Sequence, residues 1–329
     1  MKKIGVNGFG RIGRYFTRMT LDRPDVDVAV VNDLADIKTL AHLFKYDSVH
    51  RQLKHEFKLD GNKIIFENGK QIVFVSERNP ENIAWAEHGV DVVLESTGIF
   101  RTEDAASKHF KGGARKVILS APSKSGNVRT VVLGVNDHML ESSDLIISNA
   151  SCTTNSAAPM VRVMQGICEI ESAFITTIHS YTSDQRLHDA PHRDLRRARA
   201  AAESIVPTTT GAAIALSKIF PELDGRIGGC GIRVPVPNGS MTDLTLVIKN
   251  PPSAEVINVA MQDASKGYLK GILEYTNDPI VSSDIIGNPN SCLFDSLLTS
   301  VIGNMVKIVG WYDNESGYSN RLVDLAARV

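Results

Sequence analysis

Residues 4 to 14 of the chain read IGVNGFGRIGR, and this stretch decides the fold. The apolar run Ile4 to Val6 reads as a short strand, and a helical pattern begins at Arg11 and continues to Leu21. Gly8 and Gly10 lie between the strand and the helix, and Gly13 lies in the first turn of the helix, so that the three glycines have the spacing G-x-G-x-x-G. A strand that turns through such glycines into a helix is typical of a dinucleotide-binding βαβ unit. The glycines let the backbone approach a pyrophosphate, which then lies at the helix N-terminus.

The second apolar run, Val26 to Val31, ends in Asn32 and Asp33, about 20 residues after Gly13. A carboxylate at this place can accept hydrogen bonds from the ribose of NAD, and it would repel the 2′-phosphate of NADP. Glycine clusters alone more often mark plain turns, and an isolated Asp33 could be a solvated turn residue. Because the strand, the glycines and the acid occur in the expected order, the sequence predicts an NAD site.

The rest of the first 150 residues alternates short apolar runs with helical patterns. These runs are Val73 to Val75, Asp91 to Leu94, Lys116 to Leu119 and Leu145 to Ile147. We therefore expect an α/β fold with a Rossmann-type doubly wound parallel sheet over residues 1–150. Residues 151–314 contain longer alternating runs, such as Ser172 to His179, and predict an α+β catalytic domain with a larger mixed or antiparallel sheet. A helix over residues 315–329 is expected to complete the first domain.

Composition excludes several classes of protein. The net charge is -1 over 329 residues, which does not favour a nucleic-acid or membrane partner, and no apolar run approaches membrane-spanning length. The N-terminal residues lack the apolar segment and cleavage site of a signal peptide. The four cysteines have neither C-x-x-C spacing nor the Cys/His spacing of a zinc site. We expect a cytoplasmic protein with free thiols and no metal.

Cys152 is the candidate nucleophile. It lies in SNASCTTN, residues 148–155, between an apolar run and a helical run. The N-terminus of a helix favours a thiolate, although most free cysteines are buried and inert, as the contexts of Cys168 and Cys230 suggest. A thiol nucleophile needs a base, usually histidine. His179 ends an apolar run and opens a polar loop, a position that suits a base but is also common for surface residues.

Three segments are candidates for binding anions. Four arginines lie in HRDLRRARAAAES, residues 192–204, and by themselves they favour a solvated basic face. Residues 207–211, PTTTG, open a helical run and can offer hydroxyl and N–H groups to a phosphate. Arg233 lies in an apolar run, where an arginine usually has an anion as its partner. The alternative is a structural salt bridge, for example with Asp243. Together the segments indicate a phosphorylated substrate.

Taken together, these segments resemble the glyceraldehyde-3-phosphate dehydrogenase family along essentially the whole chain. The motifs that carry the resemblance are VNGFGRIGR, ESTGIF, SNASCTTN, HSYTSDQR, DLRRARAAAESIVPTTTGAA, RVPVPN and WYDNESGYSNR. SNASCTTN together with HSYT is the most specific. DLRRARAAAESIVPTTTGAA is similar to the bacterial and plastid branch of the family.

The resemblance implies an oxidoreductase of glycolysis that oxidises glyceraldehyde 3-phosphate with NAD and inorganic phosphate to 1,3-bisphosphoglycerate. Cys152 would form a hemithioacetal and then a thioester, with His179 as its base. The implied phosphate-binding residues are Ser151, Thr153, Thr182, Arg197, Thr210, Gly211 and Arg233. The implied cofactor contacts are Arg11, Ile12, Asp33, Arg78, Ser120 and Asn314, of which Asn314 orients the nicotinamide amide. The family is homotetrameric, and its loop from about Tyr181 to Ile205 lies between subunits.

The chain departs from the family at a few positions. The family commonly has a second cysteine where Ser156 stands, and it more often has threonine and valine in place of Val236 and Gly239. The pair at residues 190–191, Ala-Pro, mixes features of NAD-using and NADP-using members. An alternative is an erythrose-4-phosphate dehydrogenase, against which HSYT and PTTTG argue. A non-catalytic role as an adhesin or RNA-binding protein is the second alternative, and the retained Cys152 and His179 favour catalysis.

Overall fold

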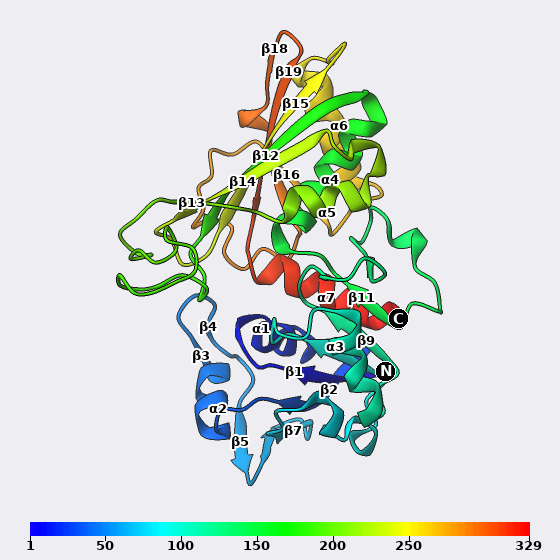
Figure 1. Ribbon diagram of the computed structural model, residues 1–329, viewed down its shortest axis with the longest axis vertical. Coiled ribbons are helices and arrows are strands. Elements are labelled where there is room, and N and C mark those ends of the chain that lie inside the picture. Colours follow the sequence, from blue (N-terminus) through cyan, green and yellow to red (C-terminus); the bar gives the residue numbers. More distant parts are fainter. The chain divides into compact units, whose positions relative to one another are not determined.

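A computed structural model describes all 329 residues, and the chain divides into two compact units. The first unit comprises Met1–Val131, Met139–Ala150 and Ser319–Val329. The second comprises Val132–His138 and Ser151–Tyr318. Each unit has its own large sheet and its own helices (Figure 1). None of the helices is both long and apolar enough to cross a membrane.

The first unit contains a nine-stranded sheet with the order β10-β11-β9-β8-β1-β2-β7-β6-β5. The strands are β1 (Lys2–Asn7), β2 (Val26–Asn32), β5 (Phe57–Asp60), β6 (Lys63–Phe66), β7 (Gln71–Val75), β8 (Val92–Glu95), β9 (Lys116–Leu119), β10 (Arg129–Thr130) and β11 (Ile146–Ser148). All pairs from β10 to β7 are parallel, which confirms the predicted Rossmann-type sheet. The antiparallel edge formed by β6 and β5 was not predicted.

The helices of this unit are α1 (Arg11–Thr20), α2 (Ile37–Lys45), α3 (Glu103–Ser107) and most of α7 (Ser316–Arg328). The sequence analysis missed α2, although Asp36 caps it by accepting a hydrogen bond from the N–H of Thr39 at 2.9 Å. The sequence pattern predicts a helix from Glu103 to Phe110, and the structure has α3 followed by a 3-10 helix over Lys108–Gly112. A two-stranded ribbon, β3 (Tyr46–Asp47) with β4 (Arg51–Gln52), follows α2.

The second unit contains an eight-stranded mixed sheet with the order β13-β14-β12-β15-β19-β17-β16, and β18 pairs with β19. Its strands are β12 (Ile170–Ser180), β13 (Val206–Thr208), β14 (Ile227–Val234), β15 (Ser240–Ile248), β16 (Leu273–Thr276), β17 (Cys292–Asp295), β18 (Ser300–Ile302) and β19 (Met305–Tyr312). Its helices are α4 (Cys152–Ile167), α5 (Ala212–Ile219) and α6 (Ala254–Lys266). The predicted mixed sheet is confirmed. The sequence also predicts a helix over residues 254–266 with Ser253 as its N-cap, and α6 has these bounds.

One face of this sheet is buried and the other is partly open. Along β12, Ile175, Thr177 and His179 are buried, whereas Phe174 on the other face is 49% exposed. This alternation follows from the two-residue period of a strand. β12 and β14 are parallel, and their register places His179 opposite Arg233. The sheet therefore places these two predicted site residues side by side on neighbouring strands.

Candidate active site

Cys152 is the first residue of α4. The preceding residue, Ser151, caps the helix, because its hydroxyl accepts a hydrogen bond from the N–H of Thr154 at 3.1 Å. Ala150 has a φ of 55°, a left-handed conformation that is unusual for a residue with a side chain. The chain therefore turns sharply before the helix, and the thiol lies at the positive end of the helix dipole.

His179 on β12 lies beside this thiol, with its Nε2 atom 3.7 Å from Sγ of Cys152. Its Nδ1 atom is 2.7 Å from the carbonyl oxygen of Ser180. Nη1 of Arg233, which can only donate, lies 3.0 Å from the same Nδ1 atom. The carbonyl can only accept, so in the tautomer that satisfies this shorter contact Nδ1 carries the hydrogen and Nε2 presents a lone pair. The lone pair is on the nitrogen nearest the thiol. The arrangement can move a proton from Cys152 to His179.

Burial sets the charge state of this pair. Burial raises the pKa of the Cys152 thiol, while Arg233 and the N–H of Thr153 act in the opposite direction. Burial, followed by the charge of Arg233, lowers the pKa of His179 to about 3. A neutral imidazole can accept the thiol proton when a substrate arrives. In the sequence, the position at a helix N-terminus favours a thiolate at Cys152, whereas the burial that opposes it depends on the tertiary structure.

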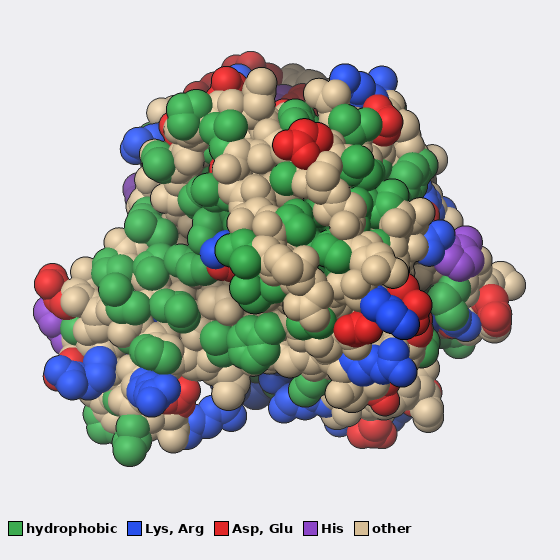
Figure 2. Space-filling view, turned by 90° about the horizontal axis from the view of Figure 1, so that it is seen from above, with side chains coloured by type: hydrophobic (Ala, Val, Ile, Leu, Met, Phe, Trp, Pro, Cys, Tyr) green, Lys and Arg blue, Asp and Glu red, His purple; other side chains and the backbone are tan.

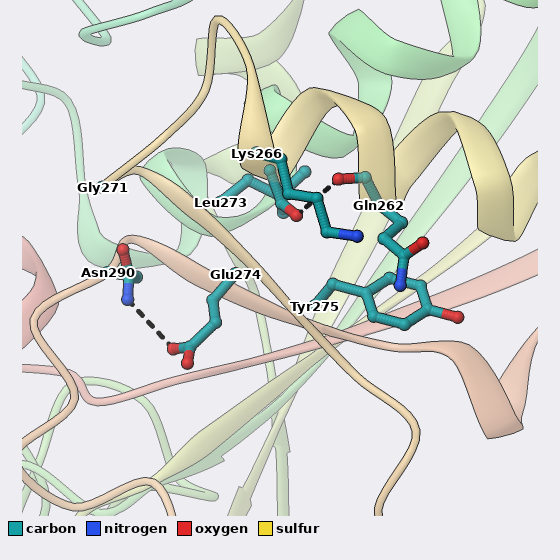
Figure 3. Close-up of a pocket in the computed structure, with 8 residues that line it drawn as sticks. Gln262, Lys266, Gly271, Leu273, Glu274, Tyr275 and Asn290 are labelled. Carbon is teal, nitrogen blue, oxygen red and sulfur yellow. Dashed lines mark hydrogen bonds between the residues drawn. The ribbon is translucent and has the colours of Figure 1, made fainter.

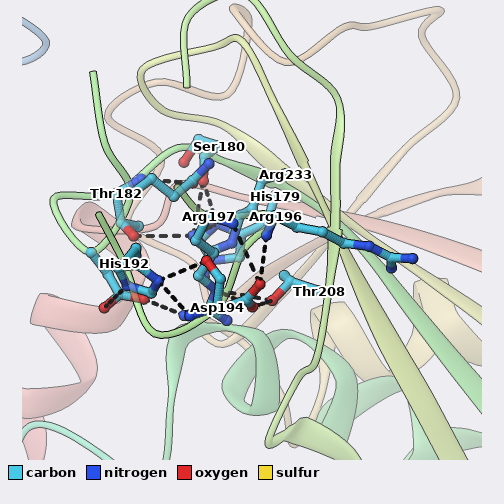
Figure 4. A network of polar contacts seen from close by, with 11 residues as sticks. His179, Ser180, Thr182, His192, Asp194, Arg196, Arg197, Thr208 and Arg233 are labelled. Carbon is cyan, nitrogen blue, oxygen red and sulfur yellow. Dashed lines mark hydrogen bonds and ion pairs between the residues drawn. The ribbon is translucent and has the colours of Figure 1, made fainter. Parts of the chain in front are cut away.

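Arg233 on β14 contacts the same histidine. Its Nη1 atom donates to the carbonyl oxygen of Ser180 at 3.1 Å and to the hydroxyl of Thr182 at 3.3 Å (Figure 4). Asp243, the acid considered as its structural partner, instead pairs with Lys307 at 2.8 Å. No carboxylate lies within ion-pair distance of Arg233. A half-buried guanidinium without an acid is available for an anion.

Arg197 has a different environment. Its guanidinium pairs with Asp184, and its Nε atom donates to the hydroxyl of Thr208 at 2.9 Å (Figure 4). Asp194 lies 3.5 Å from the same Nε atom. The charge of Arg197 is therefore already balanced by two carboxylates. A phosphate that binds here must share or replace these contacts.

The remaining predicted phosphate ligands lie at the starts of two helices. At α5, Gly211 is the N-cap residue and the hydroxyl of Thr210 accepts the N–H of Ala212 at 3.2 Å. At α4, the hydroxyl of Thr153 is hydrogen-bonded to Tyr312 at 2.8 Å rather than pointing to open space. Thr153 can therefore offer a phosphate its backbone N–H more readily than its hydroxyl.

Tyr312 is a site residue that the sequence analysis did not single out. Its buried hydroxyl contacts Thr153 at 2.8 Å and Thr177 at 2.9 Å. These contacts join the first turn of α4, which carries Cys152, to β12, which carries His179. Tyr312 therefore helps to hold the nucleophile and its base in register. In the sequence, only its position next to Asp313 and Asn314 in the motif WYDNESGYSNR could have indicated that Tyr312 belongs to the site.

Asn314 is held firmly next to His179. Its side-chain oxygen accepts the hydroxyl of Ser180 at 3.0 Å and the N–H of Gly239 at 3.1 Å. Its own N–H donates to the side-chain oxygen of Asn238 at 3.0 Å. Its Nδ2 atom lies 3.1 Å from Nε2 of His179. The amide is thus oriented by several contacts at once.

Two of the departures noted in the sequence have a structural explanation. Gly239 has a φ of +83°, and a Cβ atom there would lie 2.3 Å from the carbonyl oxygen of Ser282. A side chain at this position therefore requires the Ser282 backbone to move. Ser156, which replaces a cysteine, is buried in α4, and its hydroxyl accepts a hydrogen bond from Thr242 at 3.1 Å.

A cavity of about 470 Å³ lies in the first unit at the carboxyl ends of its parallel strands. It is lined by Asn7, Gly8, Gly10, Asn32, Asp33, Leu34, Glu77, Arg78, Ser96, Thr97, Ile99 and Phe100. This is where an open α/β sheet binds ligands. Among the predicted cofactor residues, Gly8, Gly10, Asp33 and Arg78 line it directly. Arg11, Ile12 and Gly13 form the start of α1, whereas Ser120 and Asn314 do not line the cavity.

The glycines allow a ligand to approach the backbone closely. A Cβ atom at Gly8 would lie 2.8 Å from the N atom of Thr97, and one at Gly13 would lie 2.2 Å from the carbonyl oxygen of Gly8. A Cβ atom at Gly10 would have no neighbour within 4 Å, so the backbone is open to a ligand at this position. The first turn of α1 contains no acid. These features fit the pyrophosphate of a dinucleotide.

Comparison with known proteins agrees with this geometry. Residues 2–103 match the protein-family model "Glyceraldehyde 3-phosphate dehydrogenase, NAD binding domain", and residues 151–314 match "Glyceraldehyde 3-phosphate dehydrogenase, C-terminal domain". The chain belongs to the glyceraldehyde-3-phosphate dehydrogenase family.

Curated relatives cover nearly all of the chain. It is 52% identical to glyceraldehyde-3-phosphate dehydrogenase of Geobacillus stearothermophilus and 50% identical to glyceraldehyde-3-phosphate dehydrogenase 1 of Bacillus subtilis, each over 99% of this chain and 98% of the relative. Glyceraldehyde-3-phosphate dehydrogenase 2 of Streptomyces avermitilis is 52% identical over the same shares. The chain is an NAD-dependent oxidoreductase of glycolysis, and the alternative of an erythrose-4-phosphate dehydrogenase is not favoured.

As an NAD-dependent glyceraldehyde-3-phosphate dehydrogenase, the enzyme should owe its choice of cofactor to Asp33. Asp33→Ala should narrow the preference in kcat/KM for NAD over NADP by roughly one to two decades, because a 2′-phosphate no longer meets a carboxylate. The carboxylate also accepts the N–H of Phe9 at 2.7 Å. Asp33→Asn retains an acceptor and so separates charge from this contact. Asp60→Ala, at the exposed end of strand β5, is the control. A wild-type enzyme that prefers NADP would refute this assignment.

Cys152 should be the first cysteine of this dehydrogenase to react with iodoacetamide near neutral pH. It is the one thiol with a histidine base and a helix N-terminus beside it, whereas burial raises the pKa of Cys292 to about 12. Mass mapping after brief exposure identifies the labelled residue. Labelling of Cys168 or Cys230 ahead of Cys152, with activity intact, would contradict the assignment.

A second cavity of about 290 Å³ lies in the other unit of the enzyme, beside α6 and β16. Figure 3 shows Gln262, Lys266, Glu274, Tyr275 and Asn290 around it, with Asn290 donating to Glu274 at 2.9 Å. None of its lining residues is a cysteine or histidine. Cys152 and His179 do not line it.

Proposed function

We propose that the enzyme converts glyceraldehyde 3-phosphate to 1,3-bisphosphoglycerate through a hemithioacetal and a thioester on Cys152. The observation that carries the proposal is the 3.7 Å approach of the Cys152 thiol to Nε2 of His179, with Arg233 alongside. Nucleophile, base and anion-binding cation thus belong to one cluster.

The reaction begins with proton transfer to His179. Nε2 takes the thiol proton as sulfur attacks the aldehyde carbon, and His179 then passes this proton to the aldehyde oxygen, which gives the hemithioacetal and returns the imidazole to its neutral form. NAD, held by the residues of the dinucleotide cavity, would supply the acceptor for the hydride of this carbon. His179 removes the hydroxyl proton at the same stage, and a thioester remains on Cys152. Because the acyl group is still activated, it can pass to phosphate without losing the energy of oxidation.

Release of the product needs inorganic phosphate. A phosphate oxygen attacks the thioester carbon, the C–S bond breaks, and the departing sulfur takes its proton back from His179. We assign the two phosphate groups of the reaction to Ser151, Thr153, Thr182, Arg197, Thr210, Gly211 and Arg233. Arg233 with Thr182 is the best supported pair, since their contact is in place and the arginine has no acid partner.

The domain roles follow from the same assignment. Residues 1–150 with the helix over 315–329 would bind NAD through Gly8, Gly10, Arg11, Ile12, Gly13, Asp33, Arg78 and Ser120. Residues 151–314 would carry out catalysis, and Asn314 would orient the nicotinamide amide. The fixed orientation of the Asn314 amide supports the last role.

We also propose a cytoplasmic homotetramer. Large apolar side chains of the second unit are exposed, including Phe174, Leu187, Leu195 and Ile205. Figure 2 shows apolar side chains gathered over much of the face that it presents. Leu187, Leu195 and Ile205 lie in or at the end of the segment from Tyr181 to Ile205, which we place between subunits. Analytical ultracentrifugation measures the assembly directly.

A steady-state assay tests the reaction. NADH formation is measured with glyceraldehyde 3-phosphate and with erythrose 4-phosphate, each with and without inorganic phosphate. We expect the first aldehyde to be preferred in kcat/KM and turnover to depend on phosphate, because only phosphate gives the acyl phosphate product. Equal turnover without phosphate would show hydrolysis of the thioester and would overturn the proposal.

Arg233→Lys should lower kcat/KM for glyceraldehyde 3-phosphate by roughly one to three decades. Lysine cannot reproduce the two parallel hydrogen bonds of a guanidinium with a phosphate. Activity with unphosphorylated glyceraldehyde, already poor, should change much less. Arg226→Lys, at an exposed turn, serves as the control. Equal losses on both aldehydes, together with a lower melting temperature, would assign Arg233 a structural role instead.

A further inference from the structure

A buried carboxylate lies behind the dinucleotide cavity. Glu95, at the end of β8, is 2% exposed. Its Oε2 atom accepts Nδ2 of Asn7 at 2.6 Å and Nε2 of His109 at 3.1 Å. Its Oε1 atom accepts the backbone N–H of Thr97 at 2.9 Å and also the hydroxyl of Thr97. Both carboxylate oxygens are therefore fully engaged without a lysine or arginine.

His109 is fully buried, and its tautomer is fixed by its neighbours. Nε1 of Trp85 lies 3.1 Å from Nδ1 of His109. An indole N–H can only donate, so Nδ1 must accept, and the hydrogen of His109 is on Nε2, where it donates to Glu95. The imidazole is thus neutral and acts as a donor. Burying a carboxylate in this way costs free energy unless every one of its hydrogen bonds is made.

The network leads to the wall of the cavity. Oδ1 of Asn7 accepts Nδ2 of Asn32 at 2.8 Å, and Oδ1 of Asn32 accepts the N–H of Glu77 at 2.8 Å. Asn7, Asn32, Glu77 and Thr97 all line the cavity, whereas Glu95 does not. The carboxylate therefore sets the direction of side chains and backbone groups that face a bound dinucleotide.

We propose that Glu95 and His109 are positioning residues for NAD. They do not line the cofactor cavity, but they hold Asn7 and Thr97 in one orientation before the cofactor arrives. Preorganised polar groups bind more tightly, because no ordering is needed at the moment of binding. The proposal rests on NAD as cofactor and is independent of the roles proposed for Cys152 and His179.

A glutamine cannot replace Glu95 in this network. In one orientation its amide nitrogen would face Nδ2 of Asn7 and Nε2 of His109, and in the other it would face the N–H and hydroxyl of Thr97. Each of these groups donates a hydrogen bond to Glu95 in the present structure. His109 cannot reverse its tautomer to compensate, because its Nδ1 atom must accept the indole N–H of Trp85. Glu95→Gln therefore removes the charge, changes the volume little and leaves at least one donor without an acceptor.

The test measures NAD binding directly by calorimetry for Glu95→Gln and His109→Ala, with His42→Ala on exposed α2 as the matched control. We expect the Kd for NAD to rise roughly ten-fold or more in the first two variants and to stay constant in the control. The KM for glyceraldehyde 3-phosphate and kcat at saturating NAD should change less than about two-fold. An unchanged Kd for NAD in either folded variant would overturn the proposal.

A spectroscopic measurement distinguishes positioning from a merely structural role. The chain has two tryptophans, so 5-fluorotryptophan labelling gives two 19F signals, and Trp311→Phe assigns that of Trp85. NAD should shift the Trp85 signal in the wild type and not in Glu95→Gln. An identical shift in both proteins would count against the network. Should His109→Ala not fold, Glu95→Gln decides the matter alone. Because binding is measured without turnover, an error in the proposed reaction would not affect the result.

Discussion

We expect Cys152→Ala to reduce NADH formation from glyceraldehyde 3-phosphate by at least roughly four decades in kcat/KM. Without the thiol there is no covalent hemithioacetal and no thioester, so the enzyme loses the route that divides one difficult step into two. The thiol contributes no helix cap, because Ser151 caps α4. The variant should therefore fold normally and bind NAD with unchanged affinity.

Cys168→Ala is the matched control for this experiment. Cys168 is also a partly exposed free thiol, and it donates only to the carbonyl oxygen of Met164 at 3.2 Å. The control should retain wild-type activity. Turnover by Cys152→Ala within ten-fold of the wild type would show that the reaction proceeds without a covalent intermediate on this residue.

His179→Asn should lower kcat/KM by roughly two to four decades, the range typical of a lost general base. Nε2 is the acceptor nearest the thiol, and the pKa of about 3 keeps the imidazole neutral and able to accept a proton. Rapid-mixing measurements of the first turnover should show that formation of NADH, and not only its release, is slowed. Alkylation of Cys152 by iodoacetamide should slow as well.

His138→Asn controls for the loss of a histidine as such, since His138 is exposed in the same unit. A normal rate of thioester formation in His179→Asn would assign the base to another group. A large fall in melting temperature with normal alkylation of Cys152 would instead show that His179 stabilises the fold without activating the thiol.

Local patterns predicted much of the fold. The alternation of β12 and the cap at Ser253 depend on a few adjacent residues, so the strand and the helix α6 could be read directly. The short helix α2 and the edge hairpin of β5 and β6 were missed. Their apolar periodicity extends over few residues, and the N-cap at Asp36 was the one clear signal.

In the candidate site, too, local sequence patterns predicted some features and the tertiary structure decided others. Gly8, Gly10 and Asp33 were predicted from spacing alone and do line one cavity, because a βαβ turn places them by local geometry. The structure places Arg233 beside His179 only through the parallel register of β12 with β14, two strands far apart in sequence. In the sequence, Arg197 was as good a candidate for binding an anion as Arg233. In the structure, the folded loop brings Asp184 and Asp194 to the guanidinium of Arg197.

By itself, the sequence determined the dinucleotide fold, because that fold depends on residue types at short spacing, and its resemblance along the whole chain determined the family. It offered Cys152 and His179 as candidates for the nucleophile and its base. The tertiary structure alone decided the burial that shifts the pKa values of this pair and the groups that contact the imidazole of His179. It also revealed the network of Glu95 with His109, residues separated by a turn and the short helix α3. Burial and hydrogen-bond direction depend on which groups the fold brings together from distant segments, and no local pattern records them.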